Sequence, residues 1–240
     1  MSELRGKTAL VVGAGGLGGP AALALAGAGI GRLVLADAAP VEPGDLVVAP
    51  LLAEADLGRP RGQALAGALA RLFPGLDLSA TEQPLDAERA RGLLVGVQVA
   101  ADTAGHFPGM FLVNDAAVAA GVPLVHGALL GHTAQLLSVV PGATGCLRCL
   151  FEGPPPRPEP LLPEPEPLGP LAGLVGSLLG VEAVRLLEGT PGAYAGRLLT
   201  YEARSGWSRS VPVRPRPGCP ACGGPGGVVT GGAGREGGAA

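Results

Sequence analysis

A glycine-rich turn between two apolar segments near the amino end constrains the fold of this chain more than any other feature. Residues 8–12 (TALVV) have the length and apolar character of a buried strand. The turn that follows fits G-x-G-x-x-G and contains Gly13, Gly15, Gly16 and Gly18. A helical segment comes next, and a second apolar stretch ends at Asp37, about 20 residues after the glycines. This order predicts a βαβ unit.

The same unit predicts a ligand. Glycines let backbone N–H groups approach a phosphate closely at the amino end of a helix, where the helix dipole adds partial positive charge. The carboxylate of Asp37 is suited to accept hydrogen bonds from ribose hydroxyls. Nucleotide binding is therefore the functional prediction. The alternative is a βαβ unit whose glycines serve only close packing.

The rest of the chain favours an α/β fold with a Rossmann-like, doubly wound, mainly parallel sheet. Helices are expected at residues 61–72, 86–94 and 108–121, and strands at 76–81, 94–101 and 122–125. Antiparallel C-terminal strands are expected at residues 135–140, 197–202 and 207–213, with an apolar helix at 171–187. Ligands bind past the carboxyl ends of parallel strands, and Asp37 and Asp102 are expected at those ends. The alternative is that these two aspartates are surface residues that only favour solubility.

One domain is expected over residues 1–223. Residues 153–170 are rich in proline and glutamate and read as a crossover loop or linker, and residues 224–240 read as a disordered Gly-rich tail. The amino end lacks the apolar stretch of a signal peptide, and the longest apolar run is shorter than the roughly 20 residues of a membrane span. The net charge of −3, without a basic patch, argues against nucleic acid. A cytoplasmic protein without a membrane partner is predicted.

The chain has four cysteines, arranged as two C-x-x-C pairs: Cys146 and Cys149, then Cys219 and Cys222. Each pair can supply two thiolates to a tetrahedral metal, and no cysteine is left over. The spacing therefore predicts a structural Cys₄ zinc site, which has no open position for chemistry. A redox C-x-x-C pair and four free thiols are the alternatives.

Together these stretches resemble the ThiF/MoeB/HesA family, relatives of the ubiquitin-activating enzymes. The resemblance rests on residues 4–37, EADLGRPRGQALAGALARLFPGLDL, VNDAAVAAGVPLVHGA, GCLRCLF, PLAGLVGSLLGVEAVRLL and GCPACG, and it spans residues 4–223. It implies a single domain that pairs as a homodimer and binds Mg-ATP. It further implies adenylation of the C-terminal glycine of a ubiquitin-like sulfur-carrier protein that ends in Gly-Gly.

The chain departs from the family pattern at several positions. Asp37 matches the ribose-binding aspartate, but a second acidic residue two positions later is Ala39. The family's phosphate arginine, in an Asn-Leu-x-Arg-x motif, aligns with Val48. The lysine of the family's GxPK motif is Arg61, which keeps the positive charge.

The magnesium-binding aspartate of the family's Thr-Asp-Asn motif aligns without gaps on Gly105, and a shifted alignment places it at Asp102. The resemblance therefore gives Arg61 and Asp102 as candidate catalytic residues, with Arg61 also as a nucleotide contact. Three hypotheses remain open. The chain is an adenylyltransferase in which these two residues compensate, or a non-catalytic module that binds nucleotide or protein. A nicotinamide-dependent oxidoreductase is the third, and the cysteine pairs argue against it.

Overall fold

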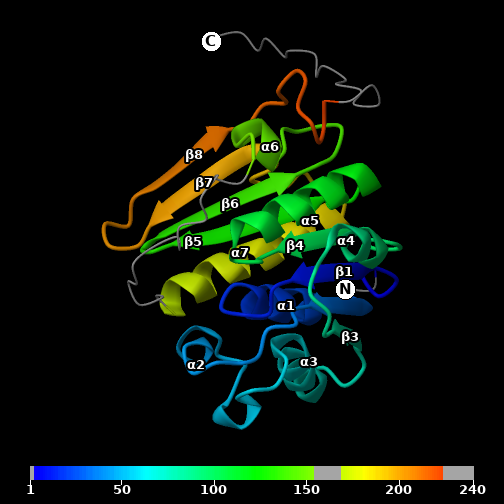
Figure 1. Ribbon diagram of the computed structural model, residues 1–240, viewed down its shortest axis with the longest axis vertical. Coiled ribbons are helices and arrows are strands. Elements are labelled where there is room, and N and C mark those ends of the chain that lie inside the picture. Colours follow the sequence, from blue (N-terminus) through cyan, green and yellow to red (C-terminus); the bar gives the residue numbers. More distant parts are fainter. Residues whose placement is uncertain (1–2, 154–168, 224–240) are drawn as a thin grey trace, which may run out of the picture.

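The computed structural model describes residues 3–153 and 169–223, which form a mixed sheet with helices on both faces (Figure 1). The strands are β1 (Thr8–Val12), β2 (Arg32–Ala36), β3 (Asp77–Thr81), β4 (Val99–Asp102), β5 (Leu124–Leu130), β6 (Thr133–Val139), β7 (Arg197–Glu202) and β8 (Ser208–Pro212). The helices are α1 (Gly18–Gly27), α2 (Asp45–Val48), the 3₁₀ helix η1 (Glu54–Asp56), α3 (Arg61–Leu72), α4 (Ala87–Leu93), α5 (Phe107–Ala120), α6 (Leu147–Leu150) and α7 (Gly169–Leu187).

The strand order confirms the predicted fold class. The eight strands lie in the order β3-β2-β1-β4-β5-β6-β7-β8. The strands from β3 to β5 run parallel, and β6, β7 and β8 are each antiparallel to their preceding neighbour. The chain passes from β1 to β2 on one side and later returns to β4 on the other side of β1. Ligands bind at the carboxyl ends of strands beside such a switch in direction.

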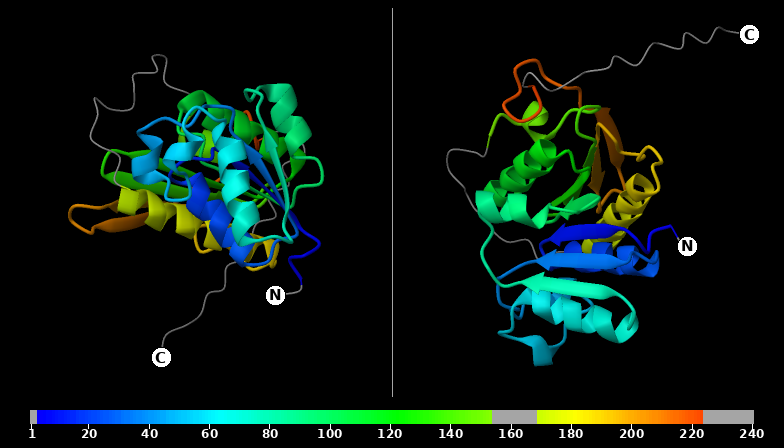
Figure 2. Two further views of the ribbon diagram at one scale, coloured as in Figure 1. Left: turned by 90° about the horizontal axis from the view of Figure 1, so that it is seen from below. Right: turned by 90° about the vertical axis from the view of Figure 1, so that its right-hand side faces the viewer.

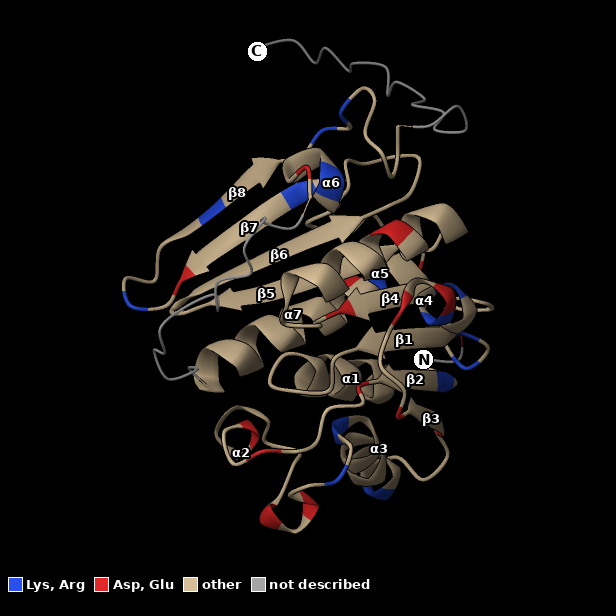
Figure 3. Ribbon diagram, viewed as in Figure 1, with Lys and Arg blue, Asp and Glu red and all other residues tan. Residues whose placement is uncertain are grey.

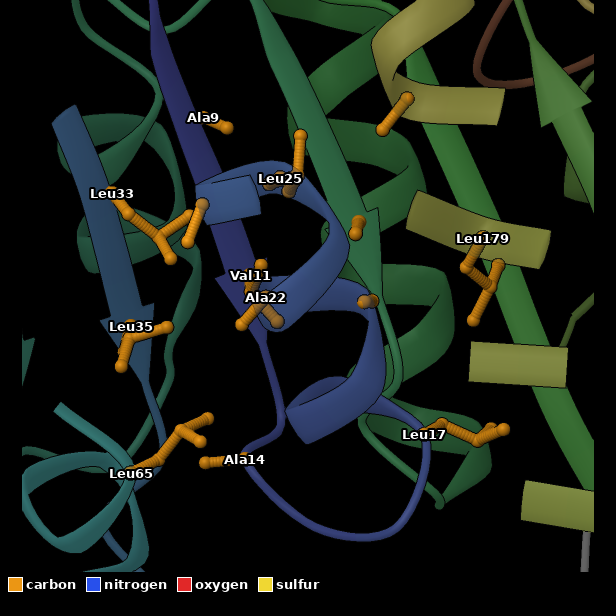
Figure 4. Close-up of a cluster of buried hydrophobic side chains, with 14 of the residues drawn as sticks. Ala9, Val11, Ala14, Leu17, Ala22, Leu25, Leu33, Leu35, Leu65 and Leu179 are labelled. Carbon is orange, nitrogen blue, oxygen red and sulfur yellow. The ribbon is translucent and has the colours of Figure 1, made fainter. Parts of the chain in front are cut away.

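Alternate strand residues bury two separate apolar layers. Ala9 and Val11 of β1 face the layer that contains α1, α3 and α7, whereas Leu10 and Val12 face α4 and α5. The two layers of helices lie on opposite sides of the sheet in Figure 2, and Figure 4 shows the first layer, with Leu25 of α1 beside β1. This two-residue alternation, with apolar layers on both faces, explains why residues 9–12 of β1 are all apolar.

Helix α7 packs closely on α1 because glycines face its neighbour. A Cβ atom on Gly180 would lie 2.4 Å from Cβ of Ala24, and one on Gly176 would lie 2.4 Å from the carbonyl oxygen of Leu17. Among the described residues, α7 is the one helix that is long and apolar enough to cross a membrane. Half of its most apolar 18-residue stretch (50%) is buried inside the fold.

Several predicted boundaries need correction. No helix is predicted between Asp37 and Arg61, yet this region contains α2 and η1. Strand β4 begins at Val99 rather than at residue 94, because residues 94–96 form a turn with Gly96 at φ 75°. Strand β5 extends to Leu130, where it forms a hairpin with β6. Residues 154–168 of the proline-rich stretch and residues 224–240 lie outside the described residues, so the domain division stays a prediction.

Candidate functional site

The glycine turn after β1 is packed against the end of β4. Gly13 has φ 91°, and a Cβ atom there would lie 2.3 Å from the carbonyl oxygen of Thr103. A Cβ atom on Gly18 would lie 1.8 Å from the carbonyl oxygen of Gly13, so this close turn needs glycine at both positions. The hydroxyl of Thr103 donates to the carbonyl oxygens of Val12 and Gly13, at 2.8 and 2.9 Å. Thr103 therefore fixes the turn to β4.

The four glycines do not all serve the same purpose. Gly15 faces open space, because a Cβ atom added there would have no other atom within 4 Å, so its neighbourhood is free for a ligand. Gly16 instead packs against α2 and α7, since a Cβ atom there would lie 3.1 Å from both Cβ of Val48 and Cβ of Ala172. Val48 is the residue that aligns with the family's phosphate arginine. Its apolar side chain therefore covers part of the turn.

A cavity of about 660 Å³ lies at the carboxyl ends of β1, β2 and β4. It is lined by residues 12–13, 36–39 and 83–85, by Arg61, and by five residues between positions 104 and 112. Most of these side chains are apolar, among them Ala39, Leu85 and Leu112. The position and size of this cavity are those of a small-molecule site in an α/β fold.

Arg61 and two aspartates form a compact ion cluster at this cavity. Nε of Arg61 lies 3.0 Å from Oδ2 of Asp37, and its Nη1 lies 2.9 Å from Oδ1 of Asp45. The Asp37 carboxylate also accepts the backbone N–H groups of Ala14 and Ala39, at 2.8 and 3.0 Å. Burial alone would lower the pKa of Arg61, but Asp37 and then Asp45 outweigh it, so that the pKa is raised.

Asp102 lies beside this region but does not line the cavity. It is fully buried at the end of β4, and its Oδ2 lies 2.8 Å from Nδ1 of His126 on β5. Its Oδ1 accepts the backbone N–H of Ala104, at 3.1 Å. A catalytic role for Asp102 stays a prediction, and it would require this pair to open. His126 is a satisfied core histidine.

His106 lines the cavity from the start of α5. Its Nδ1 accepts the backbone N–H of Gly109, at 3.0 Å, so the imidazole caps the amino end of the helix. A Cβ atom on Gly109 would lie 2.6 Å from Cε1 of the ring, so a larger residue there would displace the imidazole from this position. Gly105, which precedes the cap, has φ 73° and aligns with the family's magnesium-binding aspartate. No carboxylate therefore stands at that position.

The four cysteines converge at the far end of the sheet. Their sulfur atoms all lie within 4.8 Å of one another, and the separation is 3.8 Å between Cys146 and Cys219 and 4.0 Å between Cys146 and Cys149. Zn–S bonds of about 2.3 Å in a tetrahedron place sulfur atoms about 3.8 Å apart, so the cluster fits zinc. Without metal, burial and then the charge of Cys149 raise the pKa of Cys146 to about 11. A metal ion would offset this cost by holding the thiolates.

Helix α5 holds the first cysteine pair in place. Oδ1 of Asn114, which is fully buried, accepts the backbone N–H of Leu147 at 2.9 Å. Arg148 between the two cysteines forms hydrogen bonds of 2.7–2.9 Å with both oxygens of Asp115 and lies over the ring of Phe111, 5.1 Å from its centroid. These contacts anchor the segment between the two cysteines to α5. The adjacent polar residues Asn114 and Asp115 in an otherwise apolar helix are the signal in the sequence that could have indicated these contacts.

Comparison with known proteins places this architecture in a family. The ThiF family model matches residues 1–221. The chain belongs to the ThiF family. This match confirms the family resemblance that the glycine turn, the apolar helix at residues 171–187 and the cysteine pairs indicated.

Among characterised relatives of this ThiF-family chain, the SAMP-activating enzyme E1 of Haloferax volcanii is 37% identical over 222 residues, which cover 92% of this chain and 82% of that protein. The sulfur carrier protein ThiS adenylyltransferase of Escherichia coli is 36% identical, over 92% of this chain and 88% of its own length. Among solved structures, Escherichia coli MccB with MccA-N7isoASN has a TM-score of 0.80 at 19% identity, covering 92% of this chain and 68% of that one, and so supports the fold.

The structure thus brings the predicted nucleotide-binding residues together at one edge of the sheet: Gly13, Gly15, Gly18, Asp37 and Arg61. The four cysteines form a separate cluster away from this edge. Two features of the cavity escape sequence reasoning. Asp45 reads as part of a loop, and its pairing with Arg61 has no local signal, since the two residues are 16 positions apart. His106 reads as an ordinary loop histidine, although a polar residue before a proline-containing helix start is typical of a cap.

Proposed function

We propose that this chain binds ATP in the cavity and activates the C-terminal glycine of a ubiquitin-like sulfur-carrier protein as an acyl-adenylate. The supporting observation is an identity of 36–37% across 92% of the chain to enzymes named for activating such carriers. The cavity at the carboxyl ends of β1, β2 and β4 is the one position in the described part of this fold that suits the reaction. Its chemistry is attack of the carrier carboxylate on the α-phosphate, with release of pyrophosphate.

The chain offers specific groups for this ATP. The open side of Gly15 leaves space for a phosphate, and the backbone N–H groups of residues 15–18 donate to no acceptor among the described residues. These groups lie at the amino end of α1, where the helix dipole favours an anion. Asp37 stands at the tip of β2, where ribose hydroxyls would take the place of its present hydrogen bonds from Arg61, which would then be available as the cation.

Magnesium does not fit the residues described at this cavity. Asp37 is the carboxylate in its lining, and both of its oxygens already accept hydrogen bonds. Asp102 is buried and engaged by His126 and Ala104. We therefore assign magnesium to no described residue. Positioning of the reactants and neutralisation by Arg61 are the contributions that this chain itself can make.

Zinc, in contrast, fits the four cysteines and would have a structural role. Cys146 and Cys149 precede the proline-rich stretch, whereas Cys219 and Cys222 follow β8. A metal at this cluster would tie the last strands to the segment beside α5. With all four positions taken by thiolates, it would hold the fold and leave catalysis to the cavity.

We further propose a cytoplasmic homodimer that pairs through α7. Residues 169–181 of this helix carry no charge, and Figure 3 shows the corresponding uncharged length of ribbon. Leu174 and Val181 lie two turns apart on this length and are 45% and 50% exposed. Large apolar side chains aligned on one helix face favour burial against a second protein surface.

Carrier-dependent exchange of radiolabelled pyrophosphate into ATP tests the proposed activity. The purified chain is assayed with candidate carriers that end in Gly-Gly and with the same carriers lacking the last glycine as the control. Exchange with the full-length carrier only, abolished by Arg61→Ala, supports the proposal. Asp102→Ala tests the predicted role of Asp102 in the same assay. Absence of exchange with every carrier would contradict adenylation.

One observation favours a second candidate, a family member that binds a nucleotide or a protein without adenylating it. The guanidinium of Arg61, the cation predicted to contact phosphate, is already paired with Asp37 and Asp45. ATP binding measured by calorimetry, without exchange, would select this alternative.

A further inference from the structure

The ion cluster at the cavity has more negative than positive charge. Arg61 supplies one positive charge, and Asp37 and Asp45 supply two negative charges at distances of 3.0 and 2.9 Å. The side chains of Arg61, Asp37 and Asp45 are only 27%, 8% and 12% exposed, so solvent screens them weakly. A multiply charged phosphate that reaches this end of the cavity therefore meets a net negative charge.

We propose that Asp45 sets the ligand preference of this cavity, by neutralising Arg61 so that the resting cavity favours an uncharged nucleoside over its triphosphate. The proposal rests on the proposed nucleotide site and specifies how its charge is controlled. Asp45 acts as a positioning residue through Arg61. Without the charge of Asp45, the pair of Arg61 and Asp37 would carry no net charge, and the repulsion of a triphosphate would be removed.

Asp45 is held firmly in this position. Its Oδ2 accepts the backbone N–H of Glu42 at 2.9 Å, while its own N–H donates to the carbonyl oxygen of Glu42 at 2.9 Å. Its carbonyl oxygen accepts the N–H of Ala49 at 2.8 Å. Because α2 also packs Val48 against Gly16, the carboxylate belongs to a segment anchored on the glycine turn. The contact with Arg61 is therefore part of the packed structure.

No other side chain described in the cavity lining supplies a positive charge in place of Arg61. His106 uses Nδ1 as the acceptor for the N–H of Gly109, which requires that nitrogen to be unprotonated. The remaining lining is largely apolar, with Leu85 and Leu112 among its side chains. Such a lining suits the flat, uncharged base and sugar of a nucleoside.

Isothermal titration with adenosine and ATP, at low and high salt, tests this inference. The wild-type chain is expected to bind adenosine more tightly than ATP at low salt. Asp45→Asn, which keeps an oxygen acceptor for Glu42, is expected to tighten ATP binding about tenfold. It should change adenosine binding less than twofold, because adenosine carries no charge. The matched control is Asp77→Asn, which removes one exposed carboxylate at the opposite edge of the sheet.

Salt dependence gives a second readout that a purely structural role would not change. Added salt should strengthen ATP binding to the wild type, where Asp37 and Asp45 leave a net negative charge around Arg61, and should change ATP binding to Asp45→Asn little, because the remaining charges of Arg61 and Asp37 balance. The wild-type measurement needs no variant, so a folding defect in Asp45→Asn cannot obscure it.

Three results would overturn the inference, and they distinguish its failure from failure of the nucleotide site. If wild type prefers ATP at low salt, or if Asp45→Asn leaves the ratio of ATP to adenosine affinity unchanged, Asp45 does not set the preference, and the nucleotide site stands. If neither ligand binds the wild type or either variant, the nucleotide site itself is refuted, and this inference falls with it.

Discussion

Replacing Glu182 with glutamine isolates what one buried carboxylate contributes to the packing of α7 on the sheet. Glu182 is 2% exposed. Its Oε1 accepts the N–H of Ala193 at 2.8 Å, and its Oε2 accepts the hydroxyl of Ser138 at 3.0 Å and the N–H of Tyr194 at 3.1 Å. The carboxylate therefore joins α7 to β6 and to the segment before β7.

Glutamine keeps the shape of this side chain but has one acceptor oxygen. One donor, such as the N–H of Ala193, then faces an NH₂ group, and the bonds that remain lose their charge assistance. A bond to a charged group contributes about 1.5–3 kcal/mol, and part of this loss is offset because no charge remains buried, so we expect the free energy of unfolding to fall by about 2–4 kcal/mol. For a chain of this length, the melting temperature should fall by about 4–15 °C.

Urea denaturation followed by circular dichroism, together with calorimetry, measures this change. Ser138→Ala removes one of the three donors and should cost about 1 kcal/mol. The matched control is Glu188→Gln, which changes an exposed glutamate just beyond α7 and should have an effect below about 0.5 kcal/mol. A loss of less than about 1 kcal/mol in Glu182→Gln would refute the reasoning, because it would mean that the cost of burying the charge cancels its hydrogen bonds.

Two further predictions concern the metal cluster and the glycine turn. The purified chain should contain one zinc ion per chain by mass spectrometry of the metal, and Cys149→Ser should lose it and melt at a lower temperature; a metal-free wild type would contradict the Cys₄ assignment. Gly18→Ala should destabilise the fold by more than about 2 kcal/mol, because its Cβ would lie 1.8 Å from a carbonyl oxygen, whereas Gly15→Ala should keep stability within about 1 kcal/mol and weaken only ATP binding. Equal destabilisation by both variants in urea denaturation would show that neither glycine is reserved for a ligand.

The fold is predictable because its signals are local. The apolar run of β1, the glycine turn and Asp37 specify the βαβ unit within 30 residues of sequence. Residues 61–72 are predicted as a helix, and α3 has these bounds, since Pro60 precedes its start and Pro74 follows its end. Short elements such as α2 escape prediction because four residues carry no measurable periodicity.

The site is predictable only in part because its charges pair across distant segments. Asp37 and Arg61 are both evident from the sequence, but the contact that neutralises Arg61 comes from Asp45 in a segment that reads as a loop. Glu182 directly follows an uncharged run in the sequence, and nothing local indicates that it is buried. Its burial becomes evident only when Ser138 and the N–H groups of residues 193–194 are placed around it.

The most direct test of the account is the product formed on the carrier itself. The chain, ATP and a carrier that ends in Gly-Gly are incubated without any sulfur donor, and the mass of the intact carrier is measured by mass spectrometry. The account predicts a carrier that gains one adenylyl group, and a carrier without its last glycine that gains none. An unmodified carrier, in the presence of a chain shown by calorimetry to bind ATP, would contradict the proposed adenylation.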